Sequence, residues 1–306
     1  MKSIRLSVPA TSANVGPGYD IFALALEEPR DEFLLELIPG KEIEIRVEPE
    51  DTSIPLNPPD NTAGLALIEL RNALNLETGF RFTIFKKMRS GGGMGTTGAS
   101  AAAAIYGANR LLNLGLQDNQ MVDFARKGEV ASGGSPHADN VAAALMGGFV
   151  LIKSYSPMDV LKLNLPDMPV VLAAIRKSQR TTRGFITYEI GQEKLKEQMA
   201  RCSRVIHAIH DGDPVEFGKA ISRDYIHEPV RGAAIPGYWE VKEKVMELGA
   251  WGCTISGGGS SVIAFCPEEK QMQIARFMED AFRDNPLFVK VYQTRTSNSG
   301  VEIVEP

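Results

Sequence analysis

A glycine-rich stretch near residue 90 constrains this chain more than any other feature. Residues 89–100 read Arg-Ser-Gly-Gly-Gly-Met-Gly-Thr-Thr-Gly-Ala-Ser and continue into four alanines. Glycine lets the backbone approach a ligand closely, and alanine favours a helix. A glycine loop before a helix presents unpaired N–H groups and the positive end of the helix dipole to an anion. The stretch predicts either a phosphate loop, with Thr96 and Thr97 facing phosphate or Mg²⁺, or a surface loop that only caps a helix.

The stretch differs from two widespread nucleotide-binding motifs. A P-loop ends in Gly-Lys-Ser/Thr, and no lysine lies between Gly91 and Ser100. The dinucleotide-binding fingerprint needs a further glycine where this chain has Thr96. These differences exclude a P-loop and leave a Rossmann fold weakly supported.

Composition is that of a soluble globular protein. The 306 residues, 43% hydrophobic and 23% charged, suffice for one large domain or two ordinary ones. A net charge of −5 argues against nucleic acid or an anionic membrane as the main partner. Three scattered cysteines favour buried thiols in a reducing compartment. We find no signal peptide or membrane-spanning run, so we expect a cytoplasmic enzyme.

Hydrophobic periodicity predicts an α+β fold, because strands and helices do not alternate strictly. Residues 9–20 are expected to form a loop, and 157–169 to contain the domain boundary. The expected strands are 4–8, 33–37, 43–47, 80–85, 149–153, 170–175, 253–256, 262–265 and 287–293, and the expected helices are 65–74, 99–113, 118–127, 193–211, 215–225, 238–248 and 268–282.

Polar residues gather in several segments that suit a site. The loop at 9–20 is richer in special residues than a plain turn needs, and it can direct Asn14 and Asp20 toward a ligand. Arginines at 176–183 and in the segment 227–231 suggest carboxylate or phosphate binding, although a solvated charge run is the usual explanation.

Residues 129–140 bring together acidic, amide and histidine side chains. A single histidine, His137, beside acids is a poor transition-metal site. Mg²⁺ instead takes one or two carboxylates plus nucleotide phosphates, which suits Glu129. An ordinary helix start capped by Asp139 or Asn140 explains the same spacing equally well.

Three of these stretches together resemble the GHMP superfamily of small-molecule kinases. They are residues 9–20, the glycine loop 91–100, and 254–261, which reads Thr-Ile-Ser-Gly-Gly-Gly-Ser-Ser. Within the superfamily the strings at 9–20, 137–148 and 227–238 are most similar to the homoserine kinases. The resemblance implies a two-domain GHMP fold: an N-terminal ATP-binding domain at 1–155, a ferredoxin-like C-terminal domain at 165–285, and a final strand and tail at 286–306 that returns to the first domain.

The resemblance also implies ATP-dependent phosphorylation of the L-homoserine hydroxyl, in threonine biosynthesis. Glu129, Thr97 and Asn140 would be the catalytic residues, with Thr97 and Glu129 holding Mg²⁺. The expected ATP-binding residues are Asn61, near adenine, and Ser90, Gly91, Gly92, Gly93, Met94, Gly95, Thr96 and Thr97. The expected homoserine-binding residues are Asn14, Asp20, His137, Asp139, Arg183 and Arg231. A homodimer is left open.

The chain departs from the superfamily pattern at some positions. Thr96 and Thr97 replace a usual pair of serines, the usual proline at the loop entrance is missing, and Gly258 and Ser260 stand where alanine and proline are common. Asn140 occupies a segment where many members have an aspartate base, so catalysis would rest on positioning and electrostatics. Two alternatives remain: a GHMP kinase for a mevalonate-, pantoate- or sugar-like alcohol, and a non-catalytic relative that binds a ligand.

Overall fold

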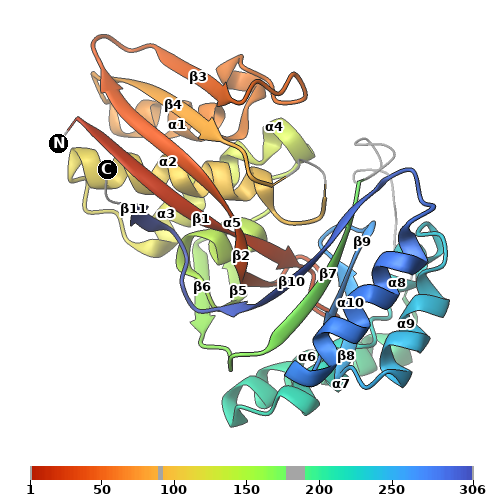
Figure 1. Ribbon diagram of the computed structural model, residues 1–306. Coiled ribbons are helices and arrows are strands. Elements are labelled where there is room, and N and C mark those ends of the chain that lie inside the picture. Colours follow the sequence, from red (N-terminus) through yellow and green to blue (C-terminus); the bar gives the residue numbers. More distant parts are fainter. Residues whose placement is uncertain (1, 89–91, 177–189, 305–306) are drawn as a thin grey trace.

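The computed structural model describes residues 2–88, 92–176 and 190–304 (Figure 1). In this part of the chain one mixed sheet runs through the molecule in the order β11-β1-β2-β10-β7-β9-β8, with β3, β4, β5 and β6 branching from β2. The strands are β1 (Ser3–Ala13), β2 (Phe22–Ile38), β3 (Ile43–Glu48), β4 (Gly79–Phe85), β5 (Phe149–Tyr155), β6 (Met158–Leu163), β7 (Pro169–Ile175), β8 (Gly252–Ser256), β9 (Ser261–Phe265), β10 (Phe288–Ser297) and β11 (Glu302–Val304).

Helices cover the sheet in both halves of the chain (Figure 1). None of those that the structure describes is long and apolar enough to cross a membrane. They are η1 (Pro58–Asp60), α1 (Thr62–Leu74), α2 (Thr96–Leu112), α3 (Asp118–Gly128), α4 (Val130–Gly133), α5 (Asp139–Met146), α6 (Gln192–Asp211), α7 (Pro214–Ile221), α8 (Glu228–Ala233), α9 (Tyr238–Glu247) and α10 (Glu268–Phe282).

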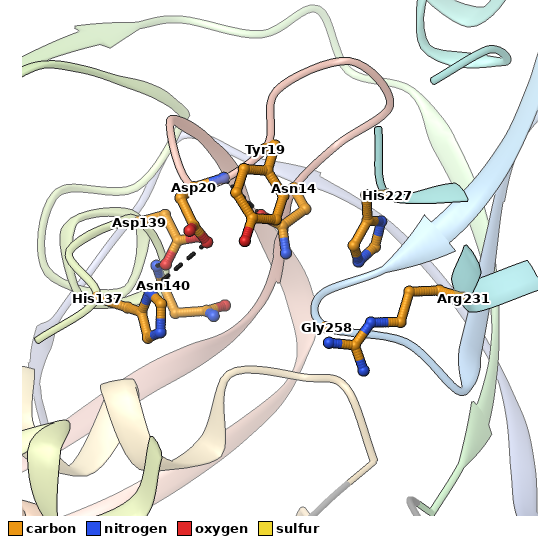
Figure 2. A pocket seen from close by; sticks show the side chains of 9 residues that line it. All are labelled: Asn14, Tyr19, Asp20, His137, Asp139, Asn140, His227, Arg231 and Gly258. Atoms are coloured by element: carbon orange, nitrogen blue, oxygen red, sulfur yellow. Dashed lines mark hydrogen bonds and ion pairs between the residues drawn. The ribbon is translucent and has the colours of Figure 1, made fainter. Parts of the chain in front are cut away.

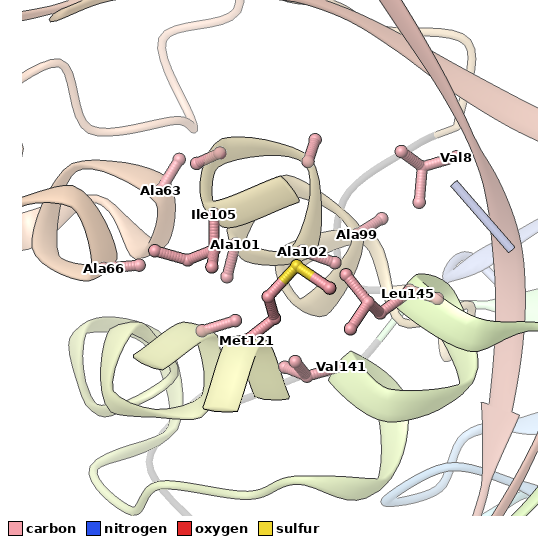
Figure 3. Close-up of a cluster of buried hydrophobic side chains, with 14 of the residues drawn as sticks. Val8, Ala63, Ala66, Ala99, Ala101, Ala102, Ile105, Met121, Val141 and Leu145 are labelled. Carbon is pink, nitrogen blue, oxygen red and sulfur yellow. The ribbon is translucent and has the colours of Figure 1, made fainter. Parts of the chain in front are cut away.

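The alanine-rich helix α2 forms the centre of the first core. Ala101, Ala102, Ala103 and Ala104 are all fully buried, and they pack among α1, α3, α5 and the strands β1, β2 and β4 (Figure 3). Because alanine has a short side chain, neighbouring helices can approach α2 closely on several sides. The same run that favours a helix therefore also places the start of α2, and the glycine loop before it, deep in the molecule.

Strand β7 lies at the centre of the second half, buried on both faces. Alternate residues point to opposite sides, as a strand requires. Leu172 belongs to the buried cluster that contains Phe217 of α7, whereas Ala173 belongs to the cluster that contains Val245 of α9 and Met278 of α10. This alternation explains why residues 169–175 form a continuous apolar run.

The last two strands connect the halves. β10 pairs with β7 and also with β2, and β11 pairs with β1. Further along, the N–H of Val301 donates to the carbonyl oxygen of Leu145 at the end of α5. The end of the described chain thus contacts the helix that carries Asp139 and Asn140.

The α+β prediction is confirmed, and most expected elements are present within a few residues of their expected limits. Two expectations were wrong. Residues 9–13, expected as part of a loop, continue strand β1, because they pair with residues 23–30 of β2. Short helices and strands also occur where none was expected, namely η1, α4, β6, α8 and β11, and β6 forms a hairpin with β5. The domain limits at 155, 165 and 285 remain a prediction.

Candidate active site

The glycine loop takes a backbone shape that only glycine accommodates at one position. Gly95 has φ 63°, and a Cβ atom placed on it would lie 1.8 Å from the Oγ1 atom of Thr11 and 2.7 Å from Oδ1 of Asn140. Helix α2 begins directly afterwards, at Thr96 rather than at the expected Ala99. Thr96 and Thr97 therefore lie in the first helical turn, where N–H groups lack helical partners and can bind an anion.

The third family-like stretch contacts this loop from the second half of the chain. The Ser256 hydroxyl donates to the carbonyl oxygen of Gly93 over 2.8 Å, and the Ser261 hydroxyl donates to that of Gly92 over 2.7 Å. On the other side, the N–H of Thr11 donates to the carbonyl oxygen of Met94. The carbonyl oxygens of residues 92–94 thus accept hydrogen bonds from neighbouring segments. The side of the loop that faces the pocket is therefore available to a ligand.

A large pocket opens over the loop and the start of α2. Its free space, including the part that is open to solvent, is about 1150 Å³. Asn61 lines it but also caps α1, because its Oδ1 atom accepts from the N–H groups of Ala63 and Gly64. Its lining includes Asn61, Met94, Gly95, Thr96, Thr97, Glu129 and Asn140.

Thr97 and Glu129 meet at the bottom of this pocket. The Thr97 hydroxyl donates to Oε2 of Glu129 over 3.3 Å, and the Glu129 side chain is only 3% exposed. A hydroxyl and a carboxylate beside a helix N-terminus are hard oxygen donors of the kind that Mg²⁺ prefers. Among the described residues no group of three or more histidine, cysteine or acidic side chains forms a metal site.

A second, smaller pocket adjoins the first at Asn140, which lines both. Its free space, including the part open to solvent, is about 430 Å³. Figure 2 shows that its acidic, histidine and arginine side chains lie in two groups, one from the first half of the chain and one from the second. We call them the acidic wall (Asp20, His137 and Asp139) and the basic wall (His227 and Arg231).

Hydrogen bonds between neighbouring side chains and the backbone of Asp20 hold the acidic wall in place. Asn14 and Asp20 both have positive φ, and Oδ1 of Asn14 accepts from the N–H of Asp20 over 2.7 Å. The hydroxyl of Tyr155 donates to the carbonyl oxygen of Asp20 over 2.6 Å. The His137 ring lies beside the carboxylate, with Nδ1 3.5 Å from Oδ1 of Asp20. These contacts direct the Asp20 carboxylate into the pocket, as Figure 2 shows.

The basic wall comes from α8 and the residue before it. His227 is 3% exposed, and Arg231 extends from α8 toward the glycine turn after β8 (Figure 2). A Cβ atom on Gly259 would lie 3.5 Å from the Arg231 side chain, so this turn packs against the arginine. The wall thus presents a guanidinium group and an imidazole group opposite the carboxylates.

Asn140 lies where the two pockets meet, and a hydrogen bond fixes its side chain. The Thr11 hydroxyl donates to its Oδ1 over 2.8 Å. With that oxygen engaged, the amide nitrogen remains as a donor toward the pockets. Asn140 therefore offers a hydrogen-bond donor, and is not a base, at the junction.

The structure brings together the predicted residues that it describes, except Gly92, which lines neither pocket. Asn61, Glu129, Asn140 and residues 93–97 line the large pocket. The small pocket is lined by Asn14, Asp20, His137, Asp139, Asn140 and Arg231. Three predicted residues, Ser90, Gly91 and Arg183, lie outside the described residues. Roles in ligand binding remain predictions for all of them.

Sequence reasoning missed four residues that line the small pocket or orient Asn140. Tyr19 and Gly258 line the small pocket, and His227 lines it too although only its neighbour Arg231 was nominated. The sequence had indicated the segment 227–231 as a candidate site, so His227 could have been found. Thr11 lies in the stretch 9–20, which was also indicated, but its hydrogen bond to Asn140 had no local signal because the two residues are 129 positions apart.

Comparisons with known proteins agree with this geometry. The family model described as GHMP kinases N terminal domain matches residues 61–148, and GHMP kinases C terminal matches 205–284. The chain is 35% identical to a homoserine kinase of Methanococcus vannielii, over 96% of each chain. It is 36% identical to one of Haloarcula marismortui, over 98% of this chain and 99% of that one. A crystal structure of homoserine kinase from Cytophaga hutchinsonii superposes with a TM-score of 0.89 at 31% identity, over 99% of this chain and 98% of the other.

Proposed function

This chain belongs to the GHMP kinase family, among its homoserine kinases, and from that membership we propose that it transfers the γ-phosphoryl group of ATP to the side-chain hydroxyl of L-homoserine. One observation supports this substrate above all. In the small pocket the acidic wall faces the basic wall, and Asn140 lines both this pocket and the large one. An α-amino acid carries both charges that these walls complement, whereas mevalonate, pantoate and sugars lack the ammonium group.

In this proposal the acidic wall binds the ammonium group of homoserine and the basic wall binds its carboxylate. Asp20 and Asp139 accept hydrogen bonds from the ammonium group. Arg231 donates to the carboxylate in the planar, forked geometry that guanidinium groups favour. The substrate hydroxyl then points to the junction at Asn140, where it meets the terminal phosphate.

The glycine loop and the first turn of α2 bind the phosphates of ATP through their N–H groups. Thr97 and Glu129 would hold Mg²⁺, which when bound neutralises charge on the phosphate oxygens. The Asn140 amide donates toward the transferring group or the attacking oxygen. Because phosphoryl transfer proceeds through a loose transition state, the hydroxyl proton can leave late, to a phosphate oxygen or to solvent, without a side-chain base.

We also propose a cytoplasmic location for the reaction. The three cysteines of the chain are free, and burial raises the pKa of Cys253 and of Cys266 to about 12. Free cysteines persist in a reducing compartment. Dimer formation stays a prediction that sedimentation can test.

A panel of acceptor alcohols tests the proposed activity. We expect ADP release, in a coupled assay with Mg²⁺, to be fastest with homoserine and much slower with mevalonate, pantoate, shikimate and galactose. Faster turnover of any other alcohol would overturn the substrate assignment. No ADP release with any of them would favour the non-catalytic alternative.

A further inference from the structure

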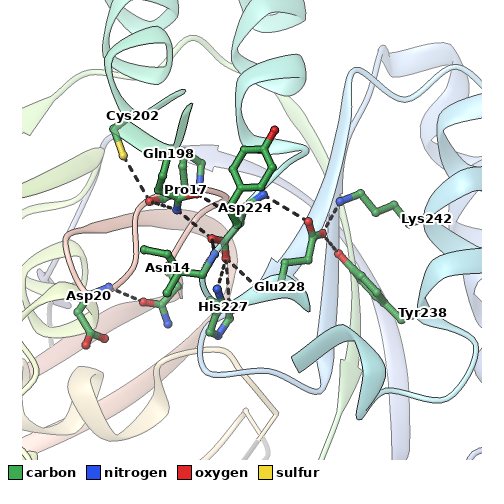
Figure 4. A network of polar contacts seen from close by, with 12 residues as sticks. Asn14, Pro17, Asp20, Gln198, Cys202, Asp224, His227, Glu228, Tyr238 and Lys242 are labelled. Carbon is green, nitrogen blue, oxygen red and sulfur yellow. Dashed lines mark hydrogen bonds and ion pairs between the residues drawn. The ribbon is translucent and has the colours of Figure 1, made fainter. Parts of the chain in front are cut away.

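Behind the small pocket lies a buried polar cluster to which no role has been assigned. It centres on Gln198 of α6 and Asp224, which precedes α8, and both are 3% exposed (Figure 4). Burying such groups costs free energy unless their hydrogen bonds are made. The hydrogen bonds of Gln198 and Asp224 therefore show how the structure compensates for burying them.

Gln198 joins the loop of the acidic wall to the segment of the basic wall. Its Nε2 atom donates to the carbonyl oxygen of Pro17 over 2.8 Å and to Oδ1 of Asp224 over 2.9 Å. Its Oε1 atom accepts from the N–H of Tyr225, also over 2.8 Å. Pro17 lies in the loop between Asn14 and Asp20, so one amide group contacts backbone on both sides of the pocket.

Asp224 fixes the start of the basic wall. Its two carboxylate oxygens accept from the N–H groups of Ile226, His227 and Glu228, over 2.8, 3.1 and 2.9 Å. Its Oδ2 atom also lies 3.6 Å from Nδ1 of His227. Although burial acts to raise the pKa of Asp224, the hydrogen bonds from His227 and the backbone outweigh it, so the pKa is lowered and the group is a carboxylate.

The far side of the same segment is also anchored. Glu228 accepts hydrogen bonds from the Tyr238 hydroxyl and from Lys242, both on α9. The segment 226–228 is therefore bonded to Asp224 on one side and to α9 on the other, as Figure 4 shows. Arg231 lies one turn later in α8, so the contacts that fix the segment 226–228 also fix the position of Arg231.

We infer that Gln198 and Asp224 are positioning residues that set the distance between the acidic and basic walls. The inference rests on the proposed function, because the two walls matter jointly only for a substrate with both charges. In an α-amino acid the ammonium and carboxylate groups share one carbon atom, so their separation is short and invariant. A pocket whose walls are bonded to one side chain can select for that separation. Binding of ATP, on the far side of Asn140, does not depend on it.

The substitution Gln198→Leu tests the inference, because it keeps the approximate volume and removes all three hydrogen bonds. Gln271→Leu is the matched control. Gln271 also donates through Nε2 to two acceptors, the carbonyl oxygens of Val170 and Thr294, but it lies on α10 away from both pockets. Asp224→Asn is the second variant. Thermal unfolding with and without ATP verifies that each variant folds.

We expect Gln198→Leu to raise KM for homoserine by about 10- to 100-fold, as small misplacements of a substrate can do, with KM for ATP unchanged. Inhibition by 3-aminopropan-1-ol and by 4-hydroxybutanoate should change much less, because each one-ended analogue uses a single wall. Gln271→Leu should leave all these constants near those of the wild type.

Other results would overturn the inference. Equal KM for homoserine in both leucine variants would show that the cluster does not position the walls. An equal loss for homoserine, both analogues and ATP would show a structural role alone. The wild type in the same assay separates the two proposals: an inactive wild type overturns the function and this inference together, whereas an active one confines the failure to the inference.

Discussion

At the scale of single residues, two side chains in the pockets differ in the charge that their surroundings favour: a carboxylate at Glu129 and a neutral amide at Asn140. Glu129 is buried beside the Thr97 hydroxyl, and a buried carboxylate is costly unless a cation or donors compensate it. Asn140 has its oxygen occupied by Thr11, so it is a donor and not a base. Exchanging acid and amide at each position, one at a time, therefore tests the two roles separately.

The substitution Glu129→Gln keeps the shape of the side chain but removes its charge. We expect kcat to fall by about 100-fold or more, since stabilisation by a bound metal is worth several kcal/mol. The rate should also need more Mg²⁺ to saturate. A Mg²⁺ titration of ADP release measures both effects. Thr97→Ser, which keeps a hydroxyl, serves as the control and should be milder. Normal rates for Glu129→Gln at limiting Mg²⁺ would refute the metal assignment.

The substitution Asn140→Asp adds the base that many superfamily members have. We expect kcat to fall, by about tenfold or more, because a negative charge would face the negative phosphoryl group and a donor would be lost. The pH profile of kcat between pH 6 and 9 should keep its shape. A higher kcat with a new acidic limb would show instead that a base assists this reaction.

At the scale of elements, the clearest patterns were the most predictable. Helix α10 occupies Glu268–Phe282, the range that the periodicity predicts. Residues 9–13 belong to the stretch 9–20, in which two prolines, two glycines and Asn14 predict a loop. They form a strand only because residues 23–30 lie beside them. Helix α8 and strand β11 are too short to show a period, so pairing and packing determine them.

The residues of the candidate site also differ in how far the sequence could predict them. The glycine loop, Asn14, Asp20 and Glu129 stand in stretches whose composition is unusual, so they could be nominated from the sequence. Gln198 lies in an ordinary amphipathic helix, and it becomes informative only through its contacts with Pro17 and Asp224. A buried polar residue whose partners lie far along the chain has no local signal.

The glycine loop allows a test at this scale. Gly95→Ala places a methyl group against Thr11 and Asn140, whereas Gly212→Ala adds it at a similar φ of 66° with nothing within 4 Å. Both variants carry the backbone strain of alanine at positive φ, about 1 kcal/mol. Only Gly95→Ala should lose ATP binding, which calorimetry can measure. Similar ATP affinity in the two variants would mean that the loop tolerates a side chain.

At the scale of the whole molecule, Asp224 couples stability to pH. Its pKa is lowered in the folded protein from an ordinary value near 3.8, so the unfolded chain binds more protons at a pH between the folded pKa and the ordinary one. The stabilisation is therefore complete above the ordinary pKa and is lost as the pH falls toward the folded pKa.

We expect Asp224→Asn to be less stable than the wild type at pH 7 and to lose less unfolding free energy between pH 6 and 3. Urea unfolding at each pH gives both values. The other acidic groups are common to the two proteins, so their contributions cancel in the difference. Parallel curves would show that Asp224 titrates alike in the folded and unfolded chains.

The pairing of β10 with β2 and of β11 with β1 has a consequence for the timing of activity during protein synthesis. A ribosome makes these strands after every other element that the structure describes. Until they emerge, β1 lacks its partner β11, β2 lacks its partner β10, and the end of α5 lacks its contact with Val301. Domains can fold while the chain is still being made, but here the helix bearing Asp139 and Asn140 is fully anchored only after the segment that contains Val301 has been made. A nascent chain that has already made its glycine loop therefore still lacks a finished catalytic cleft.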